Sequence, residues 1–392
     1  MKAKEVQDKI RQDNNKYFDD ELSYLEKEKE KILSILGVTD VPTFKYPSYL
    51  EVNLSCNTEL ISIGHIMNSC SSSGLLFRGQ NSSDYQLIPS LYRGLSRDKM
   101  NNREIINFTM SLQGKQYSNF REAANNNDVA LISTELCEEM LRWQYGQHYG
   151  LHTGYLDWTE DFFIALYFSC SHVAPKTNAV SLFTLNAKAI DVLRVMMELM
   201  DVELGIENNS VLLSEADKII ITNNDFDDFL TQKKRQEAGF LANMLPVSHE
   251  LFFPKVCRPN YSTNPRAKAQ KGFFTNLLYS FHLEDWFNSF VPYMEKRLNR
   301  CISTLPLIIK INLPVDTLSD FLLLLEKECD INQASLLLDK TNDDKKVLSI
   351  AEECNRKINC PSDKIINNGC CCQKKMEKKE PGFKLNGLVR IV

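Results

Sequence analysis

Apolar residues recur every three to four positions along several stretches of the chain, the spacing that places them on one face of an α-helix. The longest such stretch is residues 3–36, where leucines and isoleucines share a stripe and Glu and Lys fill the other faces. Gly37 is a suitable C-cap, and Pro42 follows it. We expect this helix to pack on its own domain; a partner-binding or dimerising helix is the alternative.

Short apolar runs bounded by turn residues predict strands between the helices. These runs are residues 46–54, 75–80, 179–185 and 305–313. Helical patterns cover residues 58–67, 103–112, 129–143, 162–168, 191–229, 317–329 and 345–355, with a short helix beginning at Pro265. Thr159 is expected to be the N-cap of residues 162–168, and residues 123–128 are expected to form a polar loop.

This order of elements predicts an α+β fold around one mixed or split sheet, with an N-terminal helix and helical insertions. Residues 1–45 form the expected N-terminal helical segment, and residues 46–355 the main domain, with insertions around 96–146 and 191–245. The Cys/Lys-rich segment 356–392 has no C-x-x-C pair and no following histidine. We expect this segment to be a metal-free, mobile linker that ends in a short strand.

The chain of 392 residues carries a formal net charge of −5 and has a pI near 5.8. This balance argues against a dedicated nucleic-acid binder, and no Asp/Glu cluster marks the metal site of a nuclease. No apolar run approaches the ~18 residues that span a bilayer, and the charged N-terminus is not a signal peptide. We therefore expect a cytoplasmic protein without membrane association, whose 12 cysteines are reduced thiols.

Three polar stretches are candidates for chemistry: residues 77–80, 147–161 and 264–274. Arg78, in the first, offers a planar fork of donors that suits a phosphate or carboxylate, and Gly79 permits close approach of backbone or ligand. His148, in the second, titrates near neutral pH and suits general acid/base work; an imidazole bonded to a neighbouring carbonyl is an equal alternative.

Asp157 is the candidate carboxylate of the second stretch. It lies between Leu156 and Trp158, an apolar setting that is expected to raise its pKa, and we expect it to orient His148. A buried salt bridge to an arginine of the first or third stretch is the alternative role.

The three stretches together resemble the FRG-domain family, named for a Phe-Arg-Gly motif that is here Phe77–Gly79. The resemblance extends from about residue 55 to about residue 353. Its further matching residues include Gln80, Leu87, Pro89, Ser90, Leu91, Arg93, Gln147, His148, Tyr149, Gly150, Asp157, Trp158, Thr159, Asn264, Arg266, Gln270 and Gly272. The chain departs from the family at His152-Thr153-Gly154, where Pro-Thr-Arg is usual, and at Tyr85, where a tryptophan is usual.

The resemblance implies an effector like those of bacterial conflict and phage defence. At the level of fold, the order of the motifs also resembles NAD-dependent ADP-ribosyltransferases of the arginine, serine-threonine-serine, glutamate type. This second resemblance implies NAD as cofactor and ADP-ribosyl transfer or NAD hydrolysis as the reaction. Gln270 stands where that class has its glutamate, so Asp157 would have to supply the carboxylate.

The candidate catalytic residues are therefore His148 and Asp157. The candidate cofactor-binding residues are Arg78, Gly79, Gln80, Tyr149, Thr159, Arg266 and Gln270, and no metal site is expected. The alternative is a non-catalytic module that senses a ligand or has a structural role, and in that case Gln270 pairs with backbone at a tight turn. The acceptor, a protein or a nucleic acid, stays open.

Overall fold

The computed structural model describes residues 3–38, 44–46, 49–55, 58–70, 74–95, 102–127, 139–207, 253–259, 261–262, 264–276, 281–302, 305, 307–337 and 342–358. Residues 356–358 of the predicted linker are the end of a helix, Asn342–Ile358, and the rest of the linker with its terminal strand lies outside these ranges, as does the part of the second predicted insertion beyond residue 207.

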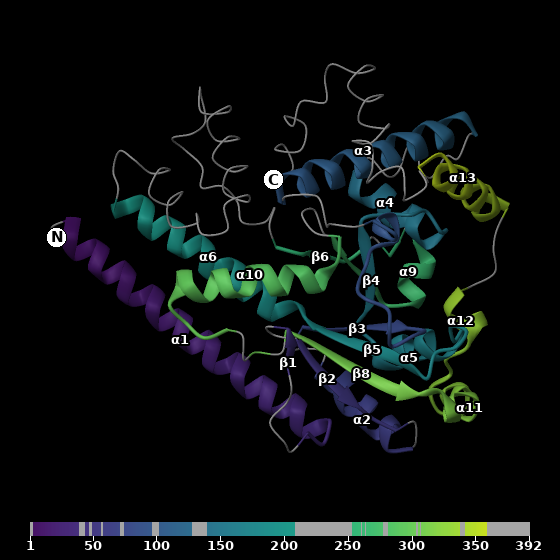
Figure 1. The fold of residues 1–392 in the computed structure, drawn as a ribbon, viewed down its shortest axis with the longest axis horizontal. Coiled ribbons are helices and arrows are strands. Elements are labelled where there is room, and N and C mark those ends of the chain that lie inside the picture. The colour runs from purple at the N-terminus through teal and green to yellow at the C-terminus, as the bar shows by residue number, and fades with distance from the viewer. Residues whose placement is uncertain are drawn as a thin grey trace.

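One sheet of eight described strands forms the centre of the fold (Figure 1). The strand order is β1-β2-β8-β5-β3-β4-β7-β6. The bounds are β1 (Phe44–Tyr46), β2 (Tyr49–Asn53), β3 (Leu75–Gln80), β4 (Tyr155–Thr159), β5 (Ala179–Asn186), β6 (Lys255–Cys257), β7 (Gly272–Asn276) and β8 (Ile308–Pro314). β2 and β8 are parallel and the other pairs are antiparallel, so the predicted α+β class with a mixed sheet is confirmed.

Helices cover both faces of the sheet, because successive side chains of a strand point to opposite sides. Leu76 of β3 and Phe183 of β5 enter a core shared with α1 (Ala3–Ile35), α6 (Ala187–Glu207) and α10 (Leu283–Leu298). Phe77 and Leu182 enter the opposite core, with α2 (Thr58–Ser69), α5 (Phe162–Cys170) and α11 (Leu318–Cys329). The strand that carries Arg78 is therefore buried from both sides.

A third core lies beside the far end of the sheet, at the upper right of Figure 1. It joins α3 (Asn102–Asn126), α4 (Glu139–His148) and α13 (Asn342–Ile358) to Tyr155 of β4 and Phe274 of β7. The short helices are α9 (Pro265–Ala269), α12 (Gln333–Leu337) and the 3₁₀ turns η2 (Ser90–Tyr92) and η5 (Val315–Thr317).

Helix α1 packs on its own chain, as predicted. Leu25 lies in the core under α6, and Ile32 and Leu36 lie in the core that includes α2. Contacts with α6 and α2 accompany this burial. The apolar stripe is thus accounted for within the chain.

Two sequence-based expectations about helices were wrong. Residues 123–126 of the loop predicted at 123–128 are the last part of α3, which continues to Asn126, and residue 128 lies outside the described residues. Ala123 and Ala124 are buried in the core with α13, and this burial outweighs the weak helix preference of the asparagines. The sequence analysis also passed over α10, although Trp286, Phe290 and Met294 recur four residues apart and are buried.

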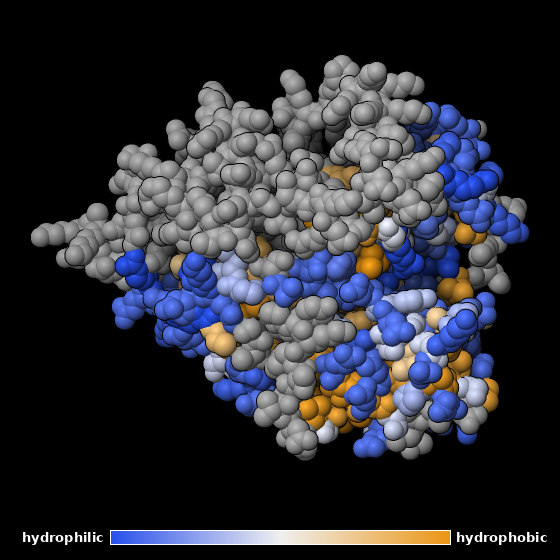
Figure 2. All heavy atoms as spheres, viewed as in Figure 1, coloured by the Kyte–Doolittle hydropathy of each residue, from blue (hydrophilic) through white to orange (hydrophobic). Residues whose placement is uncertain are grey.

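Much of the outer surface of the helices is hydrophilic, although Ile66 of α2 and Leu323 of α11 are exposed apolar side chains. Figure 2 shows hydrophilic side chains over α1 and over the exposed side of α13. Among the described residues, no helix has the length and apolar content needed to cross a membrane.

Candidate functional site

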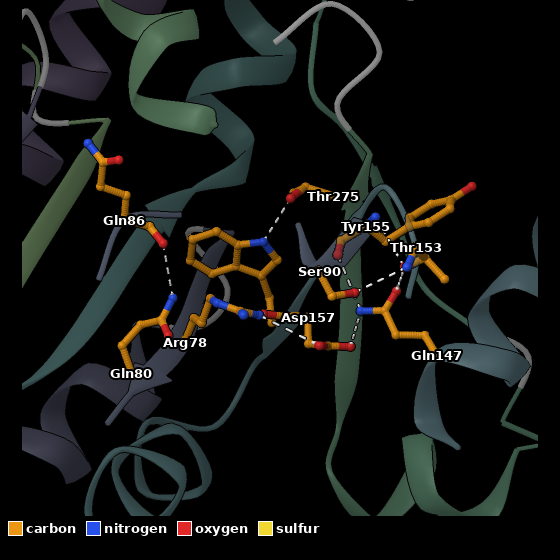
Figure 3. A network of polar contacts seen from close by, with 10 residues as sticks. Arg78, Gln80, Gln86, Ser90, Gln147, Thr153, Tyr155, Asp157 and Thr275 are labelled. Atoms are coloured by element: carbon orange, nitrogen blue, oxygen red, sulfur yellow. Dashed lines mark hydrogen bonds and ion pairs between the residues drawn. The ribbon is translucent and has the colours of Figure 1, made fainter. Parts of the chain in front are cut away.

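β3 and β4 pair at a single position, Phe77 opposite Thr159, although each strand is fully paired with its other neighbour. Arg78 lies at this β3–β4 junction. Its Nη1 donates a 2.5 Å hydrogen bond to the carbonyl oxygen of Asp157 and lies 3.7 Å from Asp157 Oδ2 (Figure 3). The first and second polar stretches of the sequence therefore meet at this junction.

The two partners differ in burial: the side chain of Arg78 is 12% exposed and that of Asp157 is 52% exposed. Burial lowers the pKa of Arg78, and the charge of Asp157 acts against that shift. Arg78 Nε is buried and has no hydrogen-bond partner among the described residues. A buried donor without a partner is uncommon in folded proteins, so Arg78 is a candidate for a functional role.

The expected apolar setting of Asp157 was wrong. Leu156 and Trp158 are its neighbours in sequence and are both buried, but side chains alternate along β4 and Asp157 points to the other side. The alternative, a buried salt bridge to Arg78, holds in part: the ion pair exists, but its carboxylate is exposed to solvent.

Gln147 holds the carboxylate of Asp157 from the opposite side. Its Nε2 donates to Asp157 Oδ1 at 2.6 Å and lies 3.3 Å from the carbonyl oxygen of Tyr155. Thr153 Oγ1 in turn donates to Gln147 Oε1 (Figure 3). The carboxylate is thus fixed by an amide and a guanidinium, both supplied by residues of the matched motifs.

His148 ends α4, and its ring packs edge-on against Phe274 with 5.4 Å between centroids. Burial, assisted by the charge of Arg266, lowers its pKa to about 4, although Asp157 opposes the shift. The imidazole is therefore neutral at pH 7, and the expectation that it titrates near neutral pH was wrong. His148 Nε2 is buried without a hydrogen-bond partner in the described ranges, so Gln147, not His148, is the side chain bonded to Asp157.

Arg266 joins the end of α4 to α9. Its Nη1 donates to the carbonyl oxygen of His148 at 2.7 Å, and its guanidinium carbon lies 5.4 Å from the ring centroid of Tyr149. Tyr149 is buried in the third core, and burial raises the pKa of its hydroxyl. The structure therefore gives both residues contacts within the chain, beside His148.

Gly79 and Gln80 also have structural contacts. A Cβ on Gly79 would lie 2.1 Å from the carbonyl oxygen of Ala165 and 2.5 Å from the amide nitrogen of Ser169, both in α5. The close approach expected at this glycine is thus made by the backbone of a helix. Gln80 is buried, and its Nε2 lies 3.4 Å from the carbonyl oxygen of Gln86.

Thr159 is not the N-cap of α5. That position belongs to Asp161, whose side chain accepts from the amide groups of Phe163 at 2.9 Å and Ile164 at 3.4 Å. Thr159 Oγ1 accepts from the amide of Asp161 at 3.1 Å and so helps to hold the N-cap residue in place. A carboxylate in β-region backbone satisfies two helix amides, which explains the two-residue shift.

Gln270 lies apart from the Arg78–Asp157 pair in its hydrogen bonding. Its Nε2 donates to the carbonyl oxygen of Leu336 at 3.1 Å and ties the third motif to α12. This contact agrees with the expectation that Gln270 pairs with backbone.

Gly154 occupies the position at which the FRG family usually has an arginine. A Cβ there would lie 2.6 Å from Gln113 Cδ and 2.6 Å from the hydroxyl oxygen of Tyr92. Gln113 Nε2 is hydrogen-bonded to that hydroxyl. The space next to the backbone of Gly154 is therefore filled by a buried Gln113–Tyr92 pair.

Glu284 is a charged group that the sequence analysis missed. It lies in the first turn of α10 and is 2% exposed, and its Oε1 accepts from the amide of Leu87 at 2.8 Å. Its Oε2 is buried without a partner among the described residues. Burial raises its pKa to about 7; Asp285 adds to the shift, and the Leu87 amide and Lys310 oppose it. Its own charge acts in turn on Arg78.

Replacing Glu284 with glutamine should change how stability depends on pH. The pKa of Glu284 is about 7 in the folded state and 4.5 ordinarily, so between pH 4.5 and pH 7 the folded state binds more protons than the unfolded state. The free energy of unfolding therefore falls as pH rises through that range. Glu284→Gln keeps an acceptor for Leu87 and should reduce this fall, giving a gain of up to roughly 3 kcal/mol at pH 8. Urea unfolding at pH 5 and pH 8 measures it, with the exposed Glu352→Gln as control. Equal pH dependence in wild type and Glu284→Gln would contradict the assignment.

No group of three or more His, Cys, Asp or Glu side chains in the described part of the chain is arranged to hold a metal ion. The groups that meet at the junction are a guanidinium, a carboxylate and the amide of Gln147.

Comparison with known proteins identifies one domain. Residues 73–178 match the family model of the FRG domain, and the chain therefore carries an FRG domain. The match spans β3, η2, α3, α4, β4 and α5, and so includes Arg78, Gln147, His148 and Asp157. No curated protein and no solved structure matches the chain.

Proposed function

We propose that this protein is a nucleotide-binding effector of the FRG type, that its ligand is NAD, and that its site is the β3–β4 junction. The observation that carries the proposal is a largely buried arginine, Arg78, fixed beside a carboxylate, Asp157, that stays exposed. Such a pair adds little to stability when one partner is solvated, so stability alone gives a weak reason for it.

A second arginine adds positive charge beside the junction. The turn that precedes Arg93 is held to the loop before β4 by two hydrogen bonds of 3.1 Å, from the Leu91 amide to the Thr153 carbonyl and from the Thr153 amide to Ser90 Oγ. Arg93 is exposed, and the structure gives it no ion pair among the described residues. Its charge acts on Arg78 and contributes to the lowered pKa of that group. Two guanidinium groups whose charges act on each other, with one carboxylate paired to Arg78 alone, favour a phosphate-bearing ligand.

Asp157 would then be the group nearest to the chemistry. Arg78 and Gln147 hold it from both sides, so it needs no rearrangement to meet a ribose hydroxyl or a developing positive charge at the anomeric carbon. In this reaction the bond between ribose and nicotinamide breaks, nicotinamide leaves with the bonding electrons, and water or an acceptor side chain forms the new bond. His148, neutral and buried, serves in this scheme to shape the wall behind Asp157.

The proposal is tested with Asp157→Asn, which keeps the size of the side chain and an acceptor for Gln147. We expect calorimetric titration to show NAD binding within about threefold of wild type, and chromatography of released nicotinamide to show turnover reduced by about 10²-fold or more. Glu160→Gln is the matched control, because Glu160 is a carboxylate three residues away that pairs with Arg258. Equal turnover in wild type and Asp157→Asn would remove Asp157 from the reaction.

The alternative, a non-catalytic ligand-sensing module, has its own supporting observation. Arg78 Nη1 bonds the backbone of β4 directly, so the arginine already serves to fasten β3 to β4. NAD binding without release of nicotinamide by wild type would favour this second function. Absence of binding would end the NAD proposal.

A further inference from the structure

A single side chain of α13, Asn355, ties that helix to the loop that leads into β4. Asn355 Oδ1 accepts from the His152 amide at 2.8 Å and from Gln116 Nε2 at 2.9 Å, and Asn355 Nδ2 donates to the Gly150 carbonyl at 2.8 Å. The side chain thereby uses its acceptor twice and its donor once. An asparagine is one of the few side chains able to do this, since it presents both kinds of group on one short stem.

Other contacts also hold this loop: the Gly150 amide donates to the Gln147 carbonyl at 2.9 Å, and the Leu151 amide donates to the Gly146 carbonyl at 3.0 Å. Gly150 has a φ of +86°, a left-handed conformation that favours glycine. Gln116, fully buried in α3, adds a 3.2 Å bond from its Nε2 to the His152 carbonyl. Leu151 is buried between these contacts in the third core. Backbone groups at residues 150 and 152 are therefore satisfied by side chains from two helices far away in sequence.

Helix α13 is well suited to carry this contact. Val347, Ile350, Ala351 and Cys354 are buried in the third core, so the helix is anchored by packing as well as by Asn355. Its other side is charged and exposed, and Figure 2 shows this hydrophilic surface at the upper right. The helix lies outside residues 73–178, the part of the chain that matches the FRG family model.

The held loop leads directly to Asp157. Thr153 follows it, donates to Gln147 Oε1 and accepts from the amide of Tyr155 at 3.3 Å. Gln147 then donates to Asp157 Oδ1 at 2.6 Å. Asn355 is thus connected to the carboxylate that Arg78 contacts through its hydrogen bond to His152, the peptide link from His152 to Thr153, and the hydrogen bonds of Thr153 and Gln147.

We propose that Asn355 is a positioning residue, through which α13 fixes the loop at residues 150–153 and so sets the Thr153–Gln147–Asp157 hydrogen bonds. The effect on ligand binding rests on the proposed function; the effect on the loop does not. Without Asn355 the amides of the loop open more often, and Gln147 loses its fixed direction toward Asp157. Helix α13 thereby becomes the element whose docking controls the site.

Hydrogen exchange of the protein without ligand tests the first part. In Asn355→Ala we expect the amide of His152 and its neighbours to exchange about tenfold faster, while amides in β3 and β5 keep their wild-type rates. Asn355→Asp retains two acceptor contacts and loses the donor to Gly150, so it should restore most of the protection. Glu352→Ala, an exposed residue of the same helix, is the matched control and should leave exchange unchanged.

A second variant separates positioning from packing. Val347→Ala opens a cavity under α13 and keeps the three hydrogen bonds of Asn355. It should therefore lower the melting temperature without a selective increase in the exchange rate of the amides at residues 150–153. The same selective exchange in Val347→Ala, or wild-type exchange in Asn355→Ala, would overturn the proposal.

Titration with NAD tests the second part. We expect Asn355→Ala to bind NAD about tenfold more weakly and Asn355→Asp to recover most of the affinity. If wild type does not bind NAD, the proposed function fails while hydrogen exchange still decides the role of Asn355. If NAD binds equally to wild type and Asn355→Ala although the loop exchanges faster, the link from loop to site is refuted and the proposed function stands.

Discussion

Gly79→Ala is expected to destabilise the protein by at least ~3 kcal/mol, a drop of roughly 5–10 °C in melting temperature. The added methyl group would lie 2.1 Å from the Ala165 carbonyl oxygen and 2.5 Å from the Ser169 amide nitrogen. These are backbone atoms of α5, so neither can turn aside as a flexible side chain would. The strand and the helix must separate, and the core that contains Phe77 and Phe162 loses its packing. Circular dichroism melts of wild type and variant measure the effect.

Gly272→Ala is the matched control, because Gly272 is also a motif glycine in a strand of the same sheet. A Cβ on Gly272 would have the Ala267 carbonyl oxygen as its nearest neighbour, at 3.4 Å, an ordinary contact distance. We expect a change within about 1 kcal/mol, of either sign. Equal effects at the two glycines would show that close packing of β3 on α5 does not explain Gly79. If Gly79→Ala is as stable as the wild-type protein but no longer binds NAD, then Gly79 contacts the ligand, as the sequence analysis expected.

Arg78→Ala is the second large effect, and the structure changes its expected size. A buried Asp157 would have been left as an uncompensated charge, at a cost of about 3–5 kcal/mol. Asp157 is 52% exposed, so water replaces the lost guanidinium at the carboxylate. What remains is the hydrogen bond to the Asp157 carbonyl and the packing of the buried stem, together about 2–4 kcal/mol.

Arg78→Lys separates the fastening of β4 from ligand binding. Lysine keeps the charge and one donor but loses the planar fork, so we expect most of the stability to remain and NAD binding to weaken by ~1–3 kcal/mol. Chemical unfolding and calorimetric titration of wild type and both variants measure the two effects separately. If the wild-type protein does not bind NAD and Arg78→Ala loses much of its stability, then Arg78 has a structural role and does not bind this ligand.

The sequence by itself determined the main elements and the family. Apolar periodicity located α1, β3, α5, β5, β8 and α11, because these segments bury a continuous stripe or run whose spacing is visible in the residues themselves. The family motifs located Arg78, Gln147 and Asp157, since the residue types and their order are written in the chain. Failures at this level were local: α10 was overlooked, and the asparagines near the end of α3 were taken for a loop.

Only the tertiary structure decided what these residues do to one another. Asp157 has apolar neighbours in sequence, but strand alternation turns it outward, so its exposure depends on which face of β4 is covered. His148 looks reactive as an imidazole, but the Phe274 ring and burial at the end of α4 keep it neutral. Gly79 has the sequence context of a ligand contact, but in the structure the backbone of α5 packs directly against it. Glu284 of α10 and Asn355 of α13 are distant in sequence, yet both form hydrogen bonds to residues of the FRG domain. Burial and hydrogen-bond partners come from segments that lie from 79 residues away, as for Arg78 and Asp157, to 203 residues away, as for His152 and Asn355, so the spacing of residues in the sequence does not reveal them.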